Sequence, residues 1–324
     1  MSSFDPNAAA AEGSGIFGLP GGVDESSLVI VPVPFAATVS YGRGTERGPA
    51  AVLEASHQVD LYDLQTGRPY ERGIHMLDVP EEILALDREG RKAAESGDHA
   101  KVDEISTTVD GWVADQVRAL RAAGKIVGVL GGDHSVPLGA IREVARDREI
   151  GILHVDAHAD LRVAYEGFRY SHASIMHNVL AEVPGVTAIA QVGIRDFCEQ
   201  ELDSIRASEG RVRTWFDHEW LSRRAEGEGL RAICDEVVSG LPRDVWVSFD
   251  IDGLDPTLCP GTGTPVPGGL DFHTACVLLE RLAEEHRIIG FDLCEVAPAD
   301  GTEWNENVGA RILYKLCGFT LLTN

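Results

Sequence analysis

The run His154-Val155-Asp156-Ala157-His158-Ala159-Asp160 decides the fold, and the run Ser248-Phe249-Asp250-Ile251-Asp252 repeats its character further along the chain. Apolar, β-favouring residues precede each run, at 150–153 and 245–247. Each run is therefore predicted to leave a buried strand at its C-terminal end. Side chains alternate between the two faces of a strand, so the acids and histidines of each run share a face. This pattern indicates a metal site.

Four carboxylates that emerge from buried strands repel one another and are costly to desolvate, so they require compensating positive charge. Neither run contains Lys or Arg. A bound cation is therefore favoured over the alternative, acids in ordinary solvated turns. At full strand rise Asp156 and Asp160 would lie about 13 Å apart, too far to share an ion at oxygen distances of about 2.1 Å. The chain must curl as it leaves the sheet.

A further ligand is predicted in Gly131-Gly132-Asp133-His134-Ser135, which follows an apolar strand at 126–130 and precedes a helical stretch beginning near Val136. Two glycines allow a tight turn with the backbone close to a bulky neighbour, and the turn delivers His134 to the same sheet edge. The resulting set of oxygen and nitrogen ligands suits manganese and, less well, nickel, cobalt, iron or zinc. Because it contains no thiolate, it does not indicate a structural zinc site.

These segments, together with S-F-D-I-D-G-L-D-P, P-G-T-G-T-P-V-P-G-G-L and G-F-D-L-C-E-V-A-P, resemble the signature segments of the ureohydrolases, the arginase and agmatinase family. They occur in the family's order between residues 126 and 299, and the stretch 31–50 resembles the family's first strand and loop. The resemblance implies an arginase-like α/β fold, a three-layer α/β/α arrangement with a mostly parallel central sheet.

The resemblance also implies a cluster of two Mn²⁺ ions, with nickel, cobalt or another divalent metal as alternatives. Its ligands would form two sets, and Asp156 and Asp250 would belong to both sets as bridging ligands. One ion would be held by His134, Asp156, Asp160 and Asp250, and the other by Asp156, His158, Asp250 and Asp252.

Two residues match family positions that handle the substrate. Glu295 matches the acid that pairs with the guanidinium group in the family, and a capping or surface acid is the alternative. His172 falls where members carry a proton-shuttling His, and a surface His at a helix N-terminus is the alternative. Two ions that share one water lower its pKa. Asp160 would then aim the nucleophile while Glu295 holds the guanidinium at attack distance, and His172 would protonate the leaving amine.

Three nearby residues are assigned supporting roles. His154 has the strand parity of the ligands but lies one step deeper, so we interpret it as a second-layer or core residue that is hydrogen-bonded to a neighbour. Asp133 and Asp255 are interpreted as turn acids or supports of the ligands.

With 324 residues and 44% hydrophobic content, the chain is long enough to bury one large core. Apolar strand candidates alternate with helical stretches such as 109–123 and 271–285, which predicts a mostly parallel sheet with helices on both faces. All ligand motifs then fall at carboxyl ends of strands. We expect a single catalytic domain at 27–324, preceded by a flexible arm at 1–26 that is rich in Ala, Gly, Ser and acids.

The chain lacks the start of a signal peptide, has no apolar run of about eighteen residues, and carries cysteines without C-x-x-C spacing. A cytoplasmic protein is predicted. The net charge of −24 disfavours nucleic acid and anionic membranes as partners; it attracts a small cationic guanidino substrate or serves solubility. The resemblance implies a homotrimer or homohexamer, and the apolar spacing at 308–322 serves either the core or a subunit contact.

The residues after Asp160 bear on the substrate. Arginase-like members carry a small polar residue where Arg162 falls, and an Arg there is closer to formimidoylglutamate hydrolases, whereas the rest of the chain looks more like agmatinase. If Arg162 lines the pocket, it would repel the ammonium group of agmatine and bind a carboxylate. Neutralisation by Glu166, or a turn of the loop to solvent, would remove that effect.

The sequence therefore predicts hydrolysis of a guanidino C–N bond to give urea and an amine, with agmatine to putrescine as the leading reaction. Guanidinobutyrase, arginase, formimidoylglutamase and guanidine hydrolase activities stay open. A metal-dependent deacetylase of the related fold would use one zinc and a catalytic Tyr; the pair Asp250 and Asp252 argues against it. A non-catalytic subunit would have lost a ligand, and none is lost.

Overall fold

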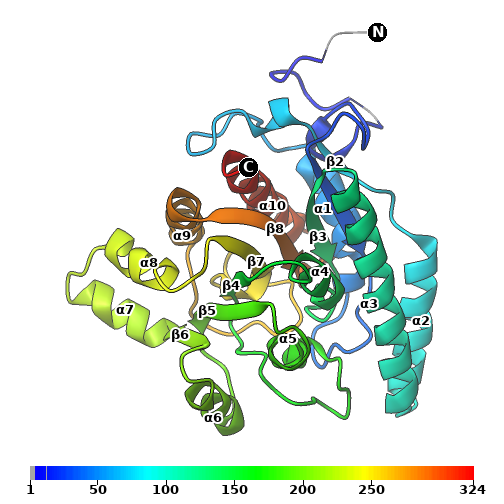
Figure 1. The fold of residues 1–324 in the computed structure, drawn as a ribbon. Coiled ribbons are helices and arrows are strands. Elements are labelled where there is room, and N and C mark those ends of the chain that lie inside the picture. Colours follow the sequence, from blue (N-terminus) through cyan, green and yellow to red (C-terminus); the bar gives the residue numbers. More distant parts are fainter. Residues whose placement is uncertain (1–3, 12) are drawn as a thin grey trace.

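A computed structural model describes residues 4–11 and 13–324 (Figure 1). Its centre is an eight-stranded sheet in which all neighbouring strands run parallel, in the order β2-β1-β3-β8-β7-β4-β5-β6. The strands are β1 (Leu28–Val33), β2 (Ile74–Met76), β3 (Ile126–Gly131), β4 (Ile150–Val155), β5 (Val186–Ile194), β6 (Val212–Phe216), β7 (Asp244–Asp250) and β8 (Arg287–Cys294).

Helices cover both faces of this sheet (Figure 1). One layer contains α1 (Gly48–Ser56), α7 (Asp217–Ala225), α8 (Leu230–Val238), α9 (Phe272–Glu285) and α10 (Trp304–Leu322). The other contains α2 (Glu81–Glu95), α3 (His99–Ala122), α4 (Leu138–Val144), α5 (Ile175–Glu182) and α6 (Glu199–Ala207). Short 3-10 turns are η1 (Ile16–Gly18), η2 (Thr45–Arg47), η3 (Pro69–Arg72), η4 (His172–Ser174) and η5 (Ile251–Gly253). The predicted three-layer α/β/α fold is confirmed.

The strand sequences explain why both faces are covered. Every residue of β1 is buried, and its side chains alternate between two cores: Leu28 and Ile30 pack with the α10 side, whereas Val29 and Val31 pack with the α3 side. A strand between two apolar layers has no polar face, which is why these strands read as continuous apolar runs. The helix expected at 109–123 is the second half of α3, whose start is capped by Asp98 accepting from the Lys101 N–H at 3.1 Å.

The N-terminal segment packs more tightly than its sequence indicated, whereas the C-terminal helix packs as one of its two interpretations predicted. In the segment expected to be a flexible arm, Ile16, Phe17 and Leu19 are buried, and the Phe17 N–H donates to Ser56 Oγ at 2.8 Å. That part of the arm belongs to the fold because its apolar side chains complete the core; residues 1–3 and 12 lie outside the described residues. Nearly all of α10 is buried, which confirms the core interpretation of 308–322.

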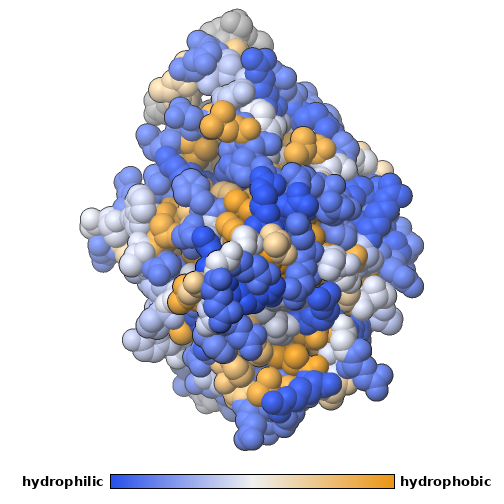
Figure 2. Space-filling view, turned by 90° about the vertical axis from the view of Figure 1, so that its left-hand side faces the viewer, coloured by the Kyte–Doolittle hydropathy of each residue, from blue (hydrophilic) through white to orange (hydrophobic). Residues whose placement is uncertain are grey.

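The face on the α7 and α8 side is mostly hydrophilic, with apolar residues scattered in small patches (Figure 2). Within the described part of the chain, no helix combines the length and apolar character needed to span a membrane.

Candidate metal centre and substrate pocket

Four neighbouring strands in the middle of the sheet, β3, β8, β7 and β4, carry the polar motifs at their carboxyl ends. His134 follows β3, Asp156 follows β4, Asp250 ends β7 and Glu295 follows β8. Parallel strands bring these ends to one edge, so residues far apart in sequence meet there. The glycine turn before His134 is required by packing, because a Cβ on Gly132 would lie 2.1 Å from the Phe35 carbonyl oxygen.

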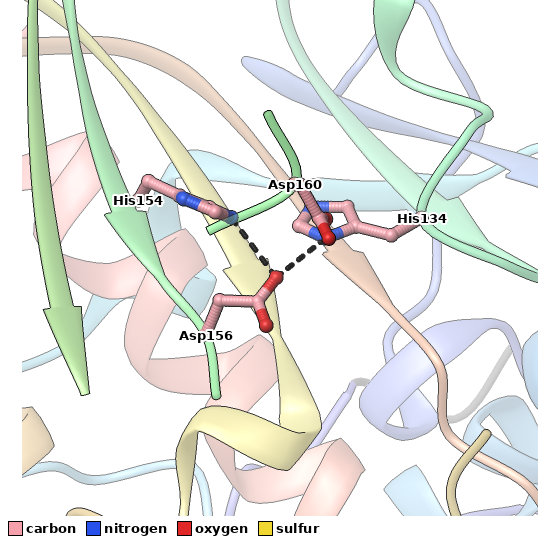
Figure 3. Close-up of side chains that lie close together, drawn as sticks. All are labelled: His134, His154, Asp156 and Asp160. Carbon is pink, nitrogen blue, oxygen red and sulfur yellow. Dashed lines mark hydrogen bonds and ion pairs between the residues drawn. The ribbon is translucent and has the colours of Figure 1, made fainter. Parts of the chain in front are cut away.

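Three carboxylates converge on one nitrogen of His134, and Figure 3 shows two of them, those of Asp156 and Asp160. Its Nδ1 lies 3.0 Å from Asp156 Oδ2, 3.3 Å from Asp160 Oδ2 and 3.4 Å from Asp250 Oδ2. All four side chains are buried. The structure therefore brings together the first predicted ligand set.

A second group forms around His158, whose Nδ1 lies 3.3 Å from Asp156 Oδ1 and 3.2 Å from Asp252 Oδ2. The two oxygens of Asp156 thus face different groups, as a bridging carboxylate would. The Oδ2 of Asp250 faces the first group, at 3.4 Å from His134 Nδ1, whereas its Oδ1 accepts the Asp252 backbone N–H at 2.8 Å. The bridging role of Asp250 stays a prediction.

The predicted curl after β4 is confirmed at Asp160, which has a φ of 54°. This left-handed conformation is uncommon for a residue with a side chain. The Asp160 carbonyl accepts the N–H groups of Met176 and His177 at 3.0 and 3.1 Å, at the start of α5. The turn is therefore held by a helix terminus, and it returns the Asp160 carboxylate to His134.

Among the described residues, neither Lys nor Arg balances the charges of this cluster by an ion pair. Burial and the charge of Asp156 raise the pKa of Asp160 to about 8, and burial with the charges of Asp252 and Asp156 raises the pKa of Asp250 well above its usual value. Burial opposes a charge on His158, yet Asp252 and Asp156 raise the pKa of its imidazole to about 12. These shifts describe a site that attracts any available positive charge.

The donor set fits divalent cations. Two groups of closely spaced ligand atoms, His134 with His154, Asp156 and Asp160, and Asp156 with His158 and Asp252, share Asp156. Among the described residues, no Lys or Arg forms an ion pair with any of the cluster's carboxylates. Carboxylate and imidazole ligands suit manganese and similar ions.

His154 lies behind the ligands, as interpreted from the sequence. Its Nε2 contacts Asp156 Oδ2 at 2.9 Å (Figure 3), and its Nδ1 lies 3.0 Å from Gln191 Nε2. The Gln191 amide also donates to the Ala159 carbonyl at 2.7 Å and accepts from Thr214 Oγ1 at 2.9 Å. Gln191 was missed from the sequence because it is an isolated polar residue in β5.

A second supporting chain holds the other edge of His134 and was also missed. His134 Nε2 lies 2.9 Å from Ser248 Oγ and 3.4 Å from Asp292 Oδ1. Ser248 donates to Asp292 at 3.0 Å, and Trp246 Nε1 donates to its other oxygen at 2.6 Å. A carboxylate in the middle of the buried strand β8 was the available signal. Such a carboxylate fixes the tautomer and orientation of a metal-binding His.

Glu295 sits beside this cluster in a strained backbone, with a φ of 66°. Its Oε1 accepts the His134 N–H at 3.0 Å, whereas its buried Oε2 has no hydrogen-bond partner among the described residues. Burial, with the charges of Asp133 and Asp252, raises the pKa of this carboxyl well above its usual value. A buried acceptor without a partner is costly, so this oxygen is available for a ligand.

His172 begins η4 and is buried rather than exposed at the surface. Its Nδ1 lies 3.4 Å from Thr38 Oγ1, and its Nε2 lies 3.4 Å from Ser40 Oγ. Burial lowers the pKa of this imidazole, which favours the neutral form. Asp133 supports the arrangement, because its Oδ2 accepts from Thr38 Oγ1 at 2.9 Å. The sequence interpretation of Asp133 as a supporting acid is therefore confirmed. Asp255, the other acid interpreted in this way, is a turn acid that accepts the Thr257 N–H at 2.8 Å.

A cavity of about 90 Å³ lies beside His158, Asp160 and His172, and we call it the substrate pocket. Its lining includes His158, Asp160, Arg162, His172 and Thr264.

Arg162 lines this pocket but does not stand alone. Its Nε lies 3.7 Å from Glu201 Oε2, and its guanidinium carbon lies 4.7 Å from the centre of the Tyr165 ring. Glu166, the neutralising partner considered from the sequence, is exposed and does not pair with it. The balancing acid comes instead from α6, because the fold returns that helix to the loop after β4.

The geometry agrees with the comparison to known proteins, in which residues 26–318 match the model of the Arginase family. The chain belongs to the arginase family. It is 36% identical over 299 residues to an N(1)-aminopropylagmatine ureohydrolase of Thermus thermophilus, covering 91% of this chain and 90% of that protein. It is 33% identical to the Synechocystis protein of the same name, with 91% and 89% covered.

Solved structures of the arginase family superpose well on this chain. The agmatine ureohydrolase of Thermoplasma volcanium matches with a TM-score of 0.73 and 26% identity, covering 93% of this chain and 92% of that one. Membership in the arginase family confirms the predicted ureohydrolase, a hydrolase of guanidino C–N bonds.

Proposed function

We propose that this arginase-family protein uses two Mn²⁺ ions to hydrolyse a guanidino compound with a cationic tail, as in agmatine to putrescine and urea. The observation that carries the proposal is Glu295 Oε2, a buried carboxylate oxygen without a protein partner among the described residues. It lies beside the His134 cluster, to which Oε1 is tied at 3.0 Å. A guanidinium group supplies the N–H donors and the positive charge that this oxygen lacks.

The cation sites would be formed by the two groups around Asp156. His134, Asp160 and Asp250 would complete one site, and His158 and Asp252 the other. Two bound divalent ions supply positive charge that lowers the pKa of a shared water and stabilises charge developing on the substrate.

The remaining steps concern protons that this chain's own side chains handle. Attack of water on the guanidinium carbon releases one proton, and the carboxylate of Asp160 lines the pocket where that proton is lost. Breaking the C–N bond then requires a proton on the departing amine nitrogen. The imidazole of His172 lines the same pocket, and its lowered pKa favours the neutral form. A neutral imidazole can take up a proton at one ring nitrogen and donate a proton from the other to the departing amine.

Arg162 and Glu201 line the substrate pocket and bear on the tail of the substrate. The Glu201 carboxylate near Arg162 reduces the repulsion that Arg162 would exert on an ammonium group. The relatives named N(1)-aminopropylagmatine ureohydrolases favour a second candidate substrate, agmatine extended by an aminopropyl group. Guanidinobutyrate, arginine, formimidoylglutamate and free guanidine remain for the experiment to distinguish.

A substrate panel tests this function. The purified chain is loaded with manganese, then with nickel, and urea or ammonia release is measured for each guanidino compound. We expect urea from agmatine or N(1)-aminopropylagmatine, with manganese giving the higher rate. Selective hydrolysis of 4-guanidinobutyrate or arginine would overturn the assignment of a cationic tail, and no release from any compound would overturn the proposed function.

We also propose a homotrimer or homohexamer, which rests on the family resemblance, and a cytoplasmic location, which rests on cysteines without C-x-x-C spacing. Light scattering of the purified chain measures the mass directly. A lone species of 34.9 kDa would contradict the oligomer.

A further inference from the structure

A second cavity, of about 200 Å³, adjoins the substrate pocket. Ser40 lines both spaces, and the loop after β4 contributes Tyr165 to the pocket and the next residue, Glu166, to the second cavity. The far wall is formed by α2, through Arg91 and Glu95. We call this space the distal cavity.

The two spaces differ in size, with about 90 Å³ for the substrate pocket and about 200 Å³ for the distal cavity. They meet at Ser40, which lines both. A substrate tail that extends past Ser40 would therefore enter the distal cavity.

The charge of the distal cavity selects the kind of tail. Its lining carries three carboxylates against two guanidinium groups. The guanidinium groups are already paired, Arg43 with Glu95 at 3.2 Å and Arg91 with Glu46 at 3.5 Å. Glu166 forms no ion pair with any residue that the structure describes. The cavity therefore has an uncompensated negative charge, which attracts a cation and repels a carboxylate.

Glu166 is presented by a tight turn in which the Tyr165 N–H donates to Phe168 O at 3.0 Å and the Phe168 N–H donates back at 2.9 Å. Glu166 and Gly167 have φ values of 51° and 94°. Gly167 has no room for a side chain, because a Cβ would lie 2.4 Å from the His99 ring. The turn fixes the place from which the carboxylate reaches the cavity.

The same backbone occurs at Glu209 and Gly210, with φ values of 53° and 89°. That pair follows α6 and lines neither the substrate pocket nor the distal cavity. The turn by itself therefore does not mark a binding site. Position beside the active site distinguishes Glu166, and Glu209 supplies a matched control.

We propose that Glu166 and the distal cavity form a subsite for the terminal ammonium of a polyamine-like tail, so that the substrate is a guanidino compound longer than agmatine. This inference rests on the proposed function, since it names the tail that the same active site accepts. Glu166 is a specificity residue in this scheme and takes no part in the chemistry.

The experiment compares three substrates on the manganese-loaded full chain: agmatine, N(1)-(3-aminopropyl)agmatine and N(1)-propylagmatine. The last has the added carbon chain but lacks the terminal ammonium. We expect kcat/KM for the aminopropyl compound to exceed that for the propyl compound by about twofold to fivefold, as for an exposed ion pair. Glu166→Gln should bring this ratio close to one, and added salt should reduce the wild-type ratio in the same direction.

Two further variants separate charge from backbone effects. Glu166→Asn removes the charge but tolerates a positive φ, so it should lower the ratio as much as Glu166→Gln. Glu209→Gln removes a carboxylate from the same kind of turn elsewhere and should keep the wild-type ratio. If Glu166→Gln keeps the wild-type ratio, the subsite is wrong while the proposed function stands. If no substrate yields urea, the proposed function itself fails.

Discussion

The floor and the rim of the active site are built in different ways. The floor consists of His134, Asp156 and Asp250, which lie at the ends of three central strands and are buried between two helix layers. The rim is built from loops: Arg162 is one-third exposed, and its partner Glu201 comes from another part of the chain. The sheet thus fixes where chemistry takes place, whereas loops that can change without disturbing the core decide which tail enters.

The largest expected effect is at the floor. Changing Asp156 or Asp250 to Asn should abolish activity, because each would contribute to both cation sites and a neutral amide removes charge from both. We expect Asp156→Asn to lose roughly both ions, since its two oxygens face different groups. His158→Asn should mainly loosen one ion.

Metal analysis of the purified variants measures this directly, with circular dichroism to show that the variants are folded. The structure makes Asp250 the sharper case, because one of its oxygens accepts the Asp252 N–H. Two ions retained in Asp250→Asn would refute its bridging role and leave Asp156 as the bridge.

The next effect is at the boundary between floor and rim. Glu295→Gln keeps the side-chain shape but removes the charge that would face the guanidinium. Loss of one partner of a buried charge pair costs about 2–5 kcal/mol, or roughly 30- to 5,000-fold in kcat/KM. The metal content should stay at the wild-type level, because Glu295 contacts the backbone N–H of His134 and not its imidazole. A wild-type kcat/KM would show that Glu295 does not hold the substrate.

A smaller effect is expected from the support behind His134. Asp292→Asn removes the negative charge beside His134 Nε2, and Ser248→Ala removes the hydroxyl next to it. Loss of such a support weakens metal binding by about 10–100-fold. Titration with manganese should recover most of the activity at high metal concentration. Thr214→Val removes the hydroxyl that donates to Gln191, which lies beside His154. Comparing its manganese affinity with that of Asp292→Asn compares the supports behind His154 and His134. Unchanged manganese affinity in Asp292→Asn would mean that the orientation of His134 is set by the ligands alone.

The floor was predictable from sequence for a physical reason. Parallel strands bring their carboxyl ends to one edge, so strand parity and turn glycines are enough to assemble His134 and the four aspartates. Supports such as Asp292 and Gln191 were missed because a single polar residue in a strand has no spacing that reveals its partner. The burial of Phe17 was missed because composition describes a segment's average and not the few apolar side chains that anchor it.

The rim was predictable only as a set of alternatives. Arg162 was recognised as the residue that bears on the substrate, but Glu166 was considered as its partner because it lies four residues away in sequence. In the fold, Tyr165 packs on Arg162 while Glu166 turns to the distal cavity. Partners across loops depend on where helices return to the sheet edge, which local sequence does not specify.

The smallest expected effect tests Arg162 itself. If Glu201 and Tyr165 hold its guanidinium, Arg162 does not contact the tail of the substrate, and agmatine is accepted. Its exposure and the 3.7 Å separation limit the electrostatic effect to less than about fivefold. The ratio of kcat/KM for agmatine over 4-guanidinobutyrate should therefore favour agmatine in the wild type and change little in Arg162→Ala. Metal content should be the same in both proteins. A wild type that prefers 4-guanidinobutyrate by about tenfold, with the preference lost in Arg162→Ala, would show instead that Arg162 leaves Glu201 to bind a carboxylate. Arg162 would then select the tail by pairing with the substrate's carboxylate, and its pairing with Glu201 in the free protein would not determine specificity.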